Sequence, residues 1–525
     1  MCIKRTPYPL LLLLLTACAF TRASEPAPAP TPTSVRIIQT TLVPTFSRQV
    51  QAVPSVEIPP TATPGALRCE VPADARTGHQ VIAEMDYASR SVIVHQQIDY
   101  INRTGGDLTQ IIFNVRPNST PQVFSLQNVT QGSDTPLTYE LTGQRLMLEL
   151  PQPLPDGCAL AVKLSFSLQI PPMEEQGRRR FQGYLGYSAR QVNLGHWLPV
   201  PAPRIDQQWV TRDEATLGEY EVLDEADWDV TLTVTNAPPD VQLAAPGTLL
   251  DATPGSWRYQ LKAARDFSLS LGQGFNIVSS QTAAGVTVEV YTYADAIIGT
   301  DSGPIDTPAF ALDVAANSLS MYSDLFGAYP YERLVLVQAD FPDGMEFSGL
   351  VFVGGEYFRG FGGPNSYLML ITVHEVAHQW WYNLVGNDQA LAPWLDESLA
   401  TYSEYIFIEE YFPALKDWWW SFRVDNFSPE GFVDSNVYEF ESRRAYINAV
   451  YLRGVRMLNE LRTALGTDVF FDWLSRYAVN GAGRIMTPET FWSLLTPEQF
   501  ETTAAIRQRY LRQPEIILIR PDSSS

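Results

Sequence analysis

The sequence reads His-Glu-Val-Ala-His at residues 374–378 and, after eighteen further residues, reaches Glu397. Residues four positions apart lie on one face of a helix, so His374 and His378 can offer ring nitrogens to the same metal ion. Glu397 can return to that ion from the following helix as a third ligand. Glu375 lies beside the two histidines and can activate a water molecule there. The stretch therefore predicts a zinc hydrolase with one Zn²⁺ ion, held by two histidines and a carboxylate.

The alternative interpretation is a chance arrangement of buried structural histidines. The 525-residue chain contains only five histidines, so a random His-Glu-x-x-His followed by a suitably placed glutamate is a rare event. His79, His95 and His196 have no candidate ligands at metal-binding spacing. We therefore assign His374 and His378 to the metal, and the other three to structural or packing roles.

The composition is that of a folded protein with more than one domain. Hydrophobic residues make up 45% of the chain and charged residues 18%, which is enough for substantial cores. The formal net charge is −22 and the sequence pI is about 4.6. This balance excludes a nucleic-acid partner, because phosphate binding needs a basic surface. An acidic site would attract a peptide's amino terminus, although solubility alone also explains the charge.

The first residues have the pattern of an export signal. Lys4 and Arg5 precede a short apolar run, residues 10–15, and small residues lead to Cys18. Residues 1–17 are therefore predicted to be a signal peptide. Their ending, Leu-Thr-Ala followed by Cys, resembles a bacterial lipobox, in which the Cys becomes the lipidated first residue. We expect a lipid-anchored protein outside the cytoplasm; the alternative is an ordinary cleaved signal and a secreted protein.

Residues 18–66 are rich in Pro, Ala, Ser and Thr and are predicted to form an extended tether. Two cysteines follow it, Cys69 and Cys158. Two cysteines in an exported protein are well placed to form a disulfide. The alternative is a pair of unpaired buried thiols.

Residues 67–275 are predicted to form an N-terminal all-β antiparallel domain. Short segments of alternating apolar and polar residues recur here, at 91–100, 160–168 and 229–234, and Gly, Pro, Asn and Asp separate them. This spacing is typical of strands joined by turns.

Residues 276–515 are predicted to form an α+β catalytic domain, with a tail at 516–525. Helical periodicity alternates here with short buried runs. We expect strands at 286–293, 334–339 and 351–353, a Gly-rich connection at 354–365, and helices at 310–326, 366–385, from about Glu397 to 411, 446–465, 469–477 and 488–495. The aromatic run at 418–420 is interpreted as a packing cluster.

Three segments together resemble the gluzincin zinc aminopeptidases, the aminopeptidase N-like family. They are the metal motif at 374–397; residues 343–346 (Asp-Gly-Met-Glu), which are similar to the family's Gly-x-Met-Glu-Asn substrate strand; and residues 451–455 (Tyr-Leu-Arg-Gly-Val), which are similar to its Tyr-x-Lys-Gly-Ala helix. The resemblance implies a β domain followed by a thermolysin-like α+β zinc peptidase domain. It also implies the release of amino-terminal residues from peptides.

The resemblance implies roles for side chains around the metal. Glu375 would act as general base, and the phenol of Tyr451 would stabilise the oxyanion. Tyr451 is preferred over Tyr446 because it keeps the family register. Glu404, seven residues after Glu397, would either support a metal-binding histidine from behind or be an exposed charge.

The resemblance also implies a substrate-binding strand, and here the sequence departs from the family. Glu346 would bind the free α-amino group, and the backbone at Gly344 and Met345 would hold the peptide in extended form. Phe347 replaces the family's Asn, which weakens the expectation of strict aminopeptidase specificity. Asp343 replaces its first Gly, which leaves the backbone contacts there open.

Two further departures are Arg453, where the family has Lys, and Tyr382, where it has Gly. The sequence also ends soon after the catalytic helices, so we expect an open cleft. The alternatives to an aminopeptidase are a zinc endopeptidase or other hydrolase, motivated by Phe347, and a surface protein that binds peptides without turnover. The intact Glu375 argues against the binding protein, which has no need of a base.

Overall fold

The computed structural model describes residues 67–173, 183–301 and 303–516. The predicted signal peptide (1–17), the lipid site Cys18, the tether (18–66) and residues 517–525 of the predicted tail lie outside the described residues. Among the helices that the structure describes, none is both long enough and apolar enough to cross a membrane.

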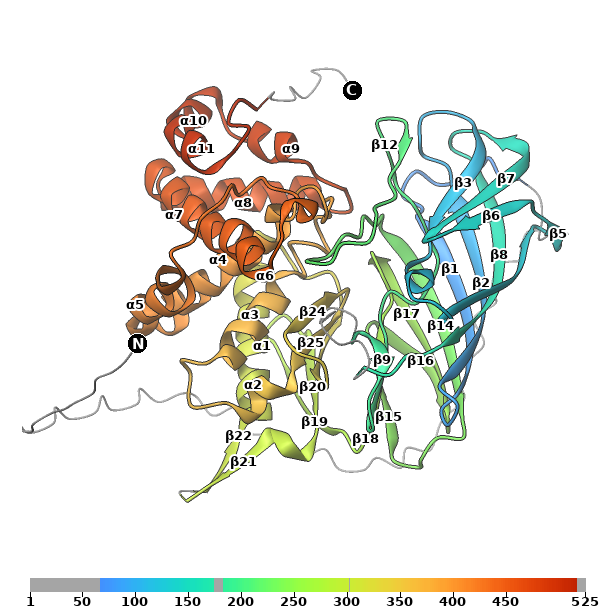
Figure 1. The fold of residues 1–525 in the computed structure, drawn as a ribbon, viewed down its shortest axis with the longest axis horizontal. Coiled ribbons are helices and arrows are strands. Elements are labelled where there is room, and N and C mark those ends of the chain that lie inside the picture. The colour runs from blue at the N-terminus through green and yellow to red at the C-terminus, as the bar shows by residue number, and fades with distance from the viewer. Residues whose placement is uncertain (1–66, 174–182, 302, 517–525) are drawn as a thin grey trace, which may run out of the picture. The chain divides into compact units, whose positions relative to one another are not determined.

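The chain up to residue 273 is built mainly from strands. In order they are β1 Thr77–Asp86, β2 Ser91–Ile101, β3 Leu108–Asn114, β4 Phe124–Gln131, β5 Thr135–Pro136, β6 Tyr139–Thr142, β7 Arg145–Leu154, β8 Ala159–Gln169, β9 Leu185–Tyr187, β10 Gln191–Leu194, β11 Val200–Pro201, β12 Arg204–Ile205, β13 Gln208–Trp209, β14 Ala226–Thr235, β15 Val241–Ala244, β16 Thr248–Thr253, β17 Ser256–Ala264 and β18 Leu269–Gln273. The three segments predicted as strands are β2, β8 and β14 (Figure 1).

These strands form one large sheet in the order β16-β17-β14-β1-β2-β8-β4-β5 and two smaller ones, β15-β18-β10-β9 and β11-β3-β7-β6. In β1, buried Val81, Ala83 and Met85 alternate with exposed residues, as expected for a sheet with one face on a core. The predicted antiparallel pairing is found throughout this part, with one exception. β1 and β14 are parallel, which the long connection between them permits.

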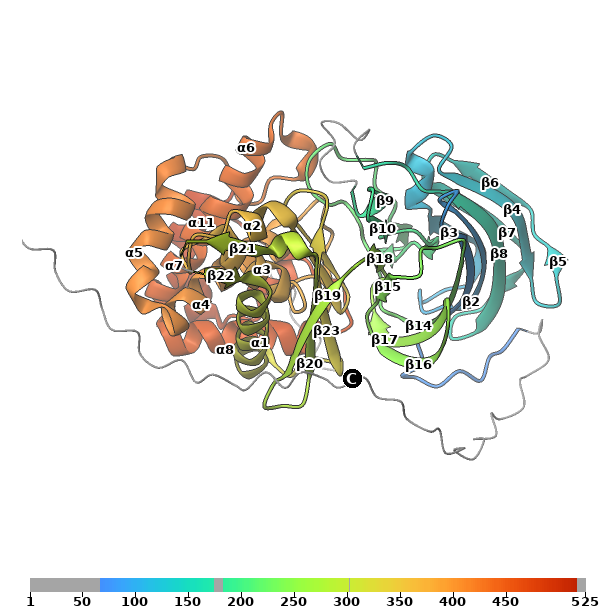
Figure 2. The same cartoon turned by 90° about the horizontal axis from the view of Figure 1, so that it is seen from below.

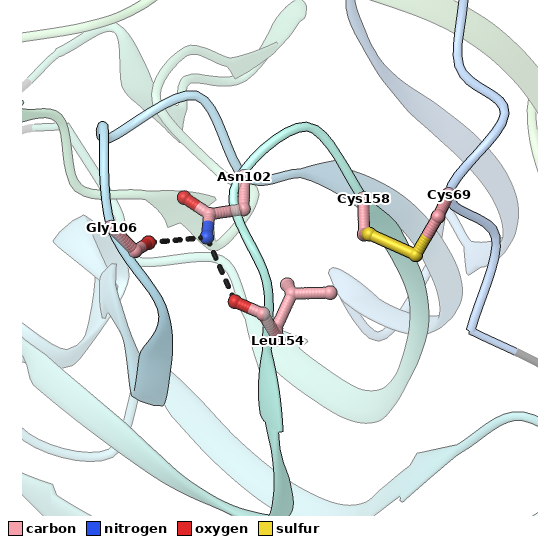
Figure 3. The surroundings of a disulfide bond; sticks show 5 residues. All are labelled: Cys69, Asn102, Gly106, Leu154 and Cys158. Carbon is pink, nitrogen blue, oxygen red and sulfur yellow. Dashed lines mark hydrogen bonds between the residues drawn. A yellow bond between two sulfur atoms is a disulfide. The ribbon is translucent and has the colours of Figure 1, made fainter.

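The predicted disulfide joins Cys69 to Cys158, so the unpaired-thiol alternative is wrong. The bond ties the segment before β1 to the start of β8, 89 residues later (Figure 3). Close by, the side-chain amide of Asn102 donates to the carbonyl oxygens of Gly106 and Leu154, both at 2.8 Å. These contacts fix the turns at this end of the strands.

The chain from residue 276 onward mixes strands and helices. The strands are β19 Asn276–Gln281, β20 Thr287–Thr292, β21 Ile297–Thr300, β22 Gly303–Asp306, β23 Arg333–Ala339, β24 Gly344–Phe347 and β25 Leu350–Gly354. The helices are α1 Thr307–Phe326, α2 Gly355–Arg359, α3 Tyr367–Ala377, α4 Trp394–Tyr411, α5 Lys416–Trp419, α6 Arg443–Tyr446, α7 Arg453–Leu465, α8 Thr467–Gly481, α9 Pro488–Ser493, α10 Pro497–Thr502 and α11 Ala504–Tyr510. The predicted α+β character is confirmed.

Three predicted elements differ from the structure. The Gly-rich connection contains α2, and the helix predicted from 446 begins at α6 and passes through a π-helical turn, Ile447–Leu452, before α7. The helix predicted at 366–385 ends at Ala377. Beyond it Tyr382 has φ of 146°, a value outside the helical region. The apolar pattern therefore continues from a helix into a compact turn.

A five-stranded sheet, β19-β20-β23-β25-β24, places the functional residues because its two faces pack differently. Helices α1 and α3 cover one face (Figures 1 and 2). On the other face, side chains of Met345, Phe347 and Phe352 join an aromatic cluster with Tyr184 of the β region. Successive strand residues point to opposite faces. Glu346, between Met345 and Phe347, therefore points to the α3 side.

Candidate metal centre and active site

The predicted metal ligands converge in the structure. His374 lies in the last turn of α3, His378 caps its end, and Glu397 lies in the first turn of α4. Nε2 of His374 lies 3.1 Å from Nε2 of His378 and 3.2 Å from Oε2 of Glu397, and the remaining pair is 3.6 Å apart. Ligands about 2.0–2.1 Å from a tetrahedral Zn²⁺ are separated by about 3.3 Å. The three atoms therefore fit a single zinc ion.

The contacts of the two Nδ1 atoms explain why both Nε2 atoms face the predicted position of the metal. Nδ1 of His378 lies 2.8 Å from the carbonyl oxygen of Trp381, and Nδ1 of His374 lies 3.1 Å from Oε1 of Glu404. Each acceptor holds the proton on Nδ1, which leaves the lone pair on Nε2 for a metal. Burial lowers the pKa of His374, but hydrogen bonds to Glu397 and Glu404 raise it to about 9.

Glu404 is held behind His374 by a second set of contacts. It is fully buried, so the exposed-charge alternative is wrong. Arg423 donates to both of its oxygens, at 2.9 and 2.8 Å, and Nε1 of Trp419 donates to it at 3.2 Å. The middle residue of the aromatic run at 418–420 therefore packs, as predicted, and also holds Glu404.

Glu375 points toward the edge strand β24. A Cβ atom added at Gly344 would lie 2.0 Å from Oε1 of Glu375, so only glycine leaves room for the carboxylate. Among the described residues, nothing hydrogen-bonds to the buried Oε2 of Glu375. Burial raises the pKa of Glu375 to about 8, against the opposing effect of the two histidines. This is a carboxylate able to accept and return a proton near neutral pH.

A group of carboxylates lies at the Glu346 end of β24. One oxygen each of Glu219, Glu346 and Glu397 lies within 4.8 Å of the other two. Burial raises the pKa of both Glu219 and Glu346, and in each the nearby carboxylates add to the increase. Nε2 of Gln389 donates to Glu346 at 3.2 Å. Carboxylates this close repel one another unless they share a proton or a cation.

Tyr451 lies directly beside the metal ligands. Its ring is parallel to that of His374, with centroids 6.0 Å apart. Burial and the neighbouring Glu397 raise the pKa of its hydroxyl well above the usual value, which keeps it a hydrogen-bond donor. The competing Tyr446 packs edge-on to Tyr451, with its hydroxyl against Gly218. The Tyr451 ring is thus stacked on a predicted metal ligand, whereas the Tyr446 ring packs on Tyr451, and the choice of Tyr451 over Tyr446 stays a prediction.

Two of the departures from the family pattern, Phe347 and Tyr382, make their contacts away from the predicted metal ligands. The ring of Phe347 packs 4.9 Å from His196 and 5.8 Å from Tyr184, on the face of the sheet opposite Glu346. Tyr382 donates its hydroxyl to Asp266 at 2.6 Å. Its φ of 146° favours glycine, the residue that the family has there.

The structure brings together the predicted metal ligands, Glu375, Tyr451, Glu346 and Gly344, but the side chain of Met345 lies on the far face of β24. The sequence reasoning missed Glu219, Gln389 and Arg423. Glu219 belongs to an irregular segment between β13 and β14, and no local pattern marks it. Of the other histidines, His79 stacks on Trp228, and His95 is exposed on β2.

Comparison with known sequences gives a partial match. Residues 310–510 match the profile of the Peptidase family M1 domain. The chain is 28% identical over 257 residues to Aminopeptidase M1-B of Oryza sativa subsp. japonica, which covers 46% of this chain and 28% of that protein. It is 29% identical over 235 residues to endoplasmic reticulum aminopeptidase 1 of Mus musculus, covering 42% and 24%. The match spans less than a third of these relatives' length.

Solved structures resemble nearly all of the described chain. An M1 zinc metallopeptidase from Deinococcus radiodurans has a TM-score of 0.60 at 17% identity, covering 87% of this chain and 96% of that chain. A mutant from the same organism, bound to a Tyr-Ser-Ala substrate, has a TM-score of 0.59 at 17% identity, covering 82% and 93%. The predicted fold class is thereby confirmed: the chain has the fold of these M1 zinc metallopeptidases.

Proposed function

We propose that the protein is a zinc aminopeptidase, which hydrolyses the first peptide bond of a substrate with a free amino terminus. One observation carries the proposal. Two carboxylates, the half-buried Glu219 and the buried Glu346, adjoin the predicted metal ligand Glu397 at one end of an edge strand. A metal site alone supports hydrolysis in general. The added anionic pocket supports a substrate with a positive end.

The chain's own residues supply the rest of the chemistry. His374, His378 and Glu397 would hold a Zn²⁺ ion, which would supply Lewis-acid polarisation of the scissile carbonyl and of the attacking water. Glu375 takes a proton from that water and returns it to the leaving amine. Tyr451 donates a hydrogen bond to the oxygen that becomes negative in the transition state.

The carboxylate group explains the expected preference for a free amino terminus. Burial and the nearby carboxylates together raise the pKa of Glu219 and of Glu346. An α-ammonium group placed between these two carboxyls would favour their charged forms and offset that increase. An acetylated peptide brings no charge and leaves these groups unpaired. Leaving charged groups without a partner in such a site discriminates strongly between free and acetylated substrates.

Two variants test the mechanism and the specificity separately. Glu375→Gln should lower kcat by about 10² to 10⁴-fold while zinc content stays unchanged. Glu346→Gln should lower kcat/KM for free peptides by about 10 to 100-fold, because a hydrogen bond to a charged group is lost. Glu498→Gln changes an exposed carboxylate in α10 and is the matched control.

The outcomes separate the alternatives. Full activity of Glu375→Gln would refute the proposed mechanism. Equal cleavage of free and amino-acetylated peptides by the wild type would indicate an endopeptidase. Zinc bound with no turnover of any peptide would indicate a binding protein.

We also propose that the protein is exported and held at a membrane by a lipid on Cys18. The sequence of residues 1–18 supports this, and so does the Cys69–Cys158 disulfide, because disulfides persist in oxidising compartments. Cys18→Ser should move the protein from the membrane fraction to the soluble fraction. Recovery of the wild type in the soluble fraction, with an unmodified Cys18, would favour a secreted protein.

A further inference from the structure

Asp343 and Arg443 join the edge strand β24 to the helix that carries Tyr451. Asp343 precedes β24, and Arg443 is the first residue of α6, which continues through the π-helical turn to Tyr451. Nη2 of Arg443 donates to Oδ2 of Asp343 at 2.6 Å. Their side chains are 33% and 26% exposed. We call this ion pair the 343–443 bridge.

Two further hydrogen bonds hold Asp343 in place, one to its carboxylate and one to its main chain. The hydroxyl of Tyr357 donates to Oδ1 of Asp343 at 2.8 Å. The main-chain amide of Gly354 donates to the main-chain carbonyl oxygen of Asp343 at 2.7 Å. Both carboxylate oxygens therefore have donors, which distinguishes the bridge from a simple surface ion pair. It fixes the distance between the strand and the helix at this point.

The direction of a bound peptide follows from the site. β24 is the last strand of its sheet among the described residues, so a peptide can add to its outer edge. In the proposed function Glu346 binds the α-amino group, which places the scissile bond by Gly344, next to Glu375. The peptide thus runs antiparallel to β24. Beyond the scissile bond it continues toward Asp343.

The bridge lies on that continuation. Strand residues advance by about 3.4 Å each, and Asp343 directly precedes Gly344. The bridge therefore crosses the path at about the first or second residue after the scissile bond. Longer peptides must displace the ion pair or leave the strand at this point.

We propose that the 343–443 bridge restricts the leaving side of the substrate, so that dipeptides and tripeptides are the preferred substrates. Asp343 and Arg443 are then specificity-determining residues. This inference rests on the proposed aminopeptidase function, because that function sets the direction of the peptide.

The test compares alanine peptides from the dipeptide to the hexapeptide, using the full-length zinc-loaded protein. Initial rates of removal of the first residue give kcat/KM for each length. In the wild type, kcat/KM should fall by about tenfold between the tripeptide and the pentapeptide, equivalent to about 1.4 kcal/mol in the barrier. Asp343→Gly and Arg443→Ala should each abolish most of this fall.

Three further variants make the result specific. Asp343 has φ of 69°, a conformation that glycine adopts readily, so Asp343→Gly is compatible with the fold; Asp343→Asn offers an isosteric second choice. Arg444→Ala removes the same charge one residue later, from an arginine stacked on Phe427, and should keep the wild-type length profile. The double variant Asp343→Gly/Arg443→Ala should show the same dependence on peptide length as either single variant, because each change removes the 343–443 bridge.

A wild-type profile that is flat with length would overturn the inference while leaving the aminopeptidase proposal intact. A fall that persists unchanged in Asp343→Gly, Asp343→Asn and Arg443→Ala would do the same. Absence of cleavage of every free peptide by the wild type would refute the proposed function, and this inference with it.

Discussion

At the scale of single residues, the contacts of the two metal-binding imidazoles differ in kind. His378 is oriented by a backbone carbonyl, whereas His374 depends on the side chain of Glu404. Glu404 depends in turn on Arg423, which binds both of its oxygens. The orientation of His374 therefore rests on two side chains that mutation can remove.

Glu404→Gln and Arg423→Met should each lower zinc affinity by about 10 to 100-fold, the usual cost of losing a partner behind a metal ligand. Competition with a chromophoric chelator measures this affinity without any substrate. Arg456→Met is the control, because Arg456 pairs with the half-exposed Asp425. Unchanged affinity in both variants would show that Glu404 has no part in orienting His374.

His79 makes folding stability depend on pH. It is buried, stacks 4.0 Å from Trp228, and accepts a hydrogen bond from Gln96 on Nδ1 at 2.9 Å. Burial lowers its pKa from 6.5 to about 3. The unfolded chain therefore binds a proton that the folded chain does not. This contribution to stability is complete above about pH 6.5 and is lost as the pH falls toward 3.

Between pH 7 and pH 4.5, His79 alone should cost the wild type roughly 3 kcal/mol of unfolding free energy. His79→Gln should lose correspondingly less over the same range. Urea unfolding of both proteins at the two pH values measures the difference. Parallel losses in wild type and variant would contradict the prediction.

At the scale of elements, the sequence predicted those whose signals are local. The strands β2, β8 and β14 show alternation, and α1 ends at Phe326, as expected. The helical metal motif fixed two ligands and their spacing. The end of α3 was missed because apolar residues continue through the turn at Tyr382 and mimic a helical pattern.

The local sequence could not predict features that depend on contacts between segments far apart in the chain. Glu219 reaches the site from an irregular segment of the β region, and Arg423 from the chain after α5. The role of Phe347 was misjudged for a related reason. Alternation along β24 turns the Phe347 side chain to the face opposite Glu346. Which face of β24 packs against α3 depends on how the whole sheet is assembled, and the local sequence does not show it.

The Cys69–Cys158 disulfide stabilises the start of the β region through the unfolded state. It closes a loop with a sequence separation of 89 residues, for which chain entropy predicts roughly 4–5 kcal/mol. The Cys69→Ser/Cys158→Ser variant should have an unfolding free energy lower by about that amount, measured by urea unfolding. Adding a reductant should not change the unfolding free energy of this variant. Equal stability of the wild type with and without reductant, under conditions where the bond is shown to be cleaved, would refute this.

At the scale of the whole molecule, Arg265 joins the β region to the metal-binding region. This buried residue follows β17. Its guanidinium donates to five backbone carbonyl oxygens, those of Leu223, Tyr382, Asn383, Leu384 and Arg484, at 2.6–3.3 Å. Leu223 follows Glu219 by four residues, and Tyr382 follows His378 by four. One side chain thus connects the segment that carries Glu219 to the segment that carries His378.

Arg265→Met should therefore be costly in two measurable ways. Methionine leaves the five buried carbonyl oxygens without their donor, so unfolding free energy should fall by about 3–5 kcal/mol. Because Glu219 and His378 lose a common anchor, KM for free peptides should rise at temperatures where the variant is still folded. Arg258→Met on β17, whose arginine pairs with Asp229 at the surface, should cost less than about 1 kcal/mol. Equal losses in the two variants would mean that Arg265 contributes no more to stability than an exposed ion pair does.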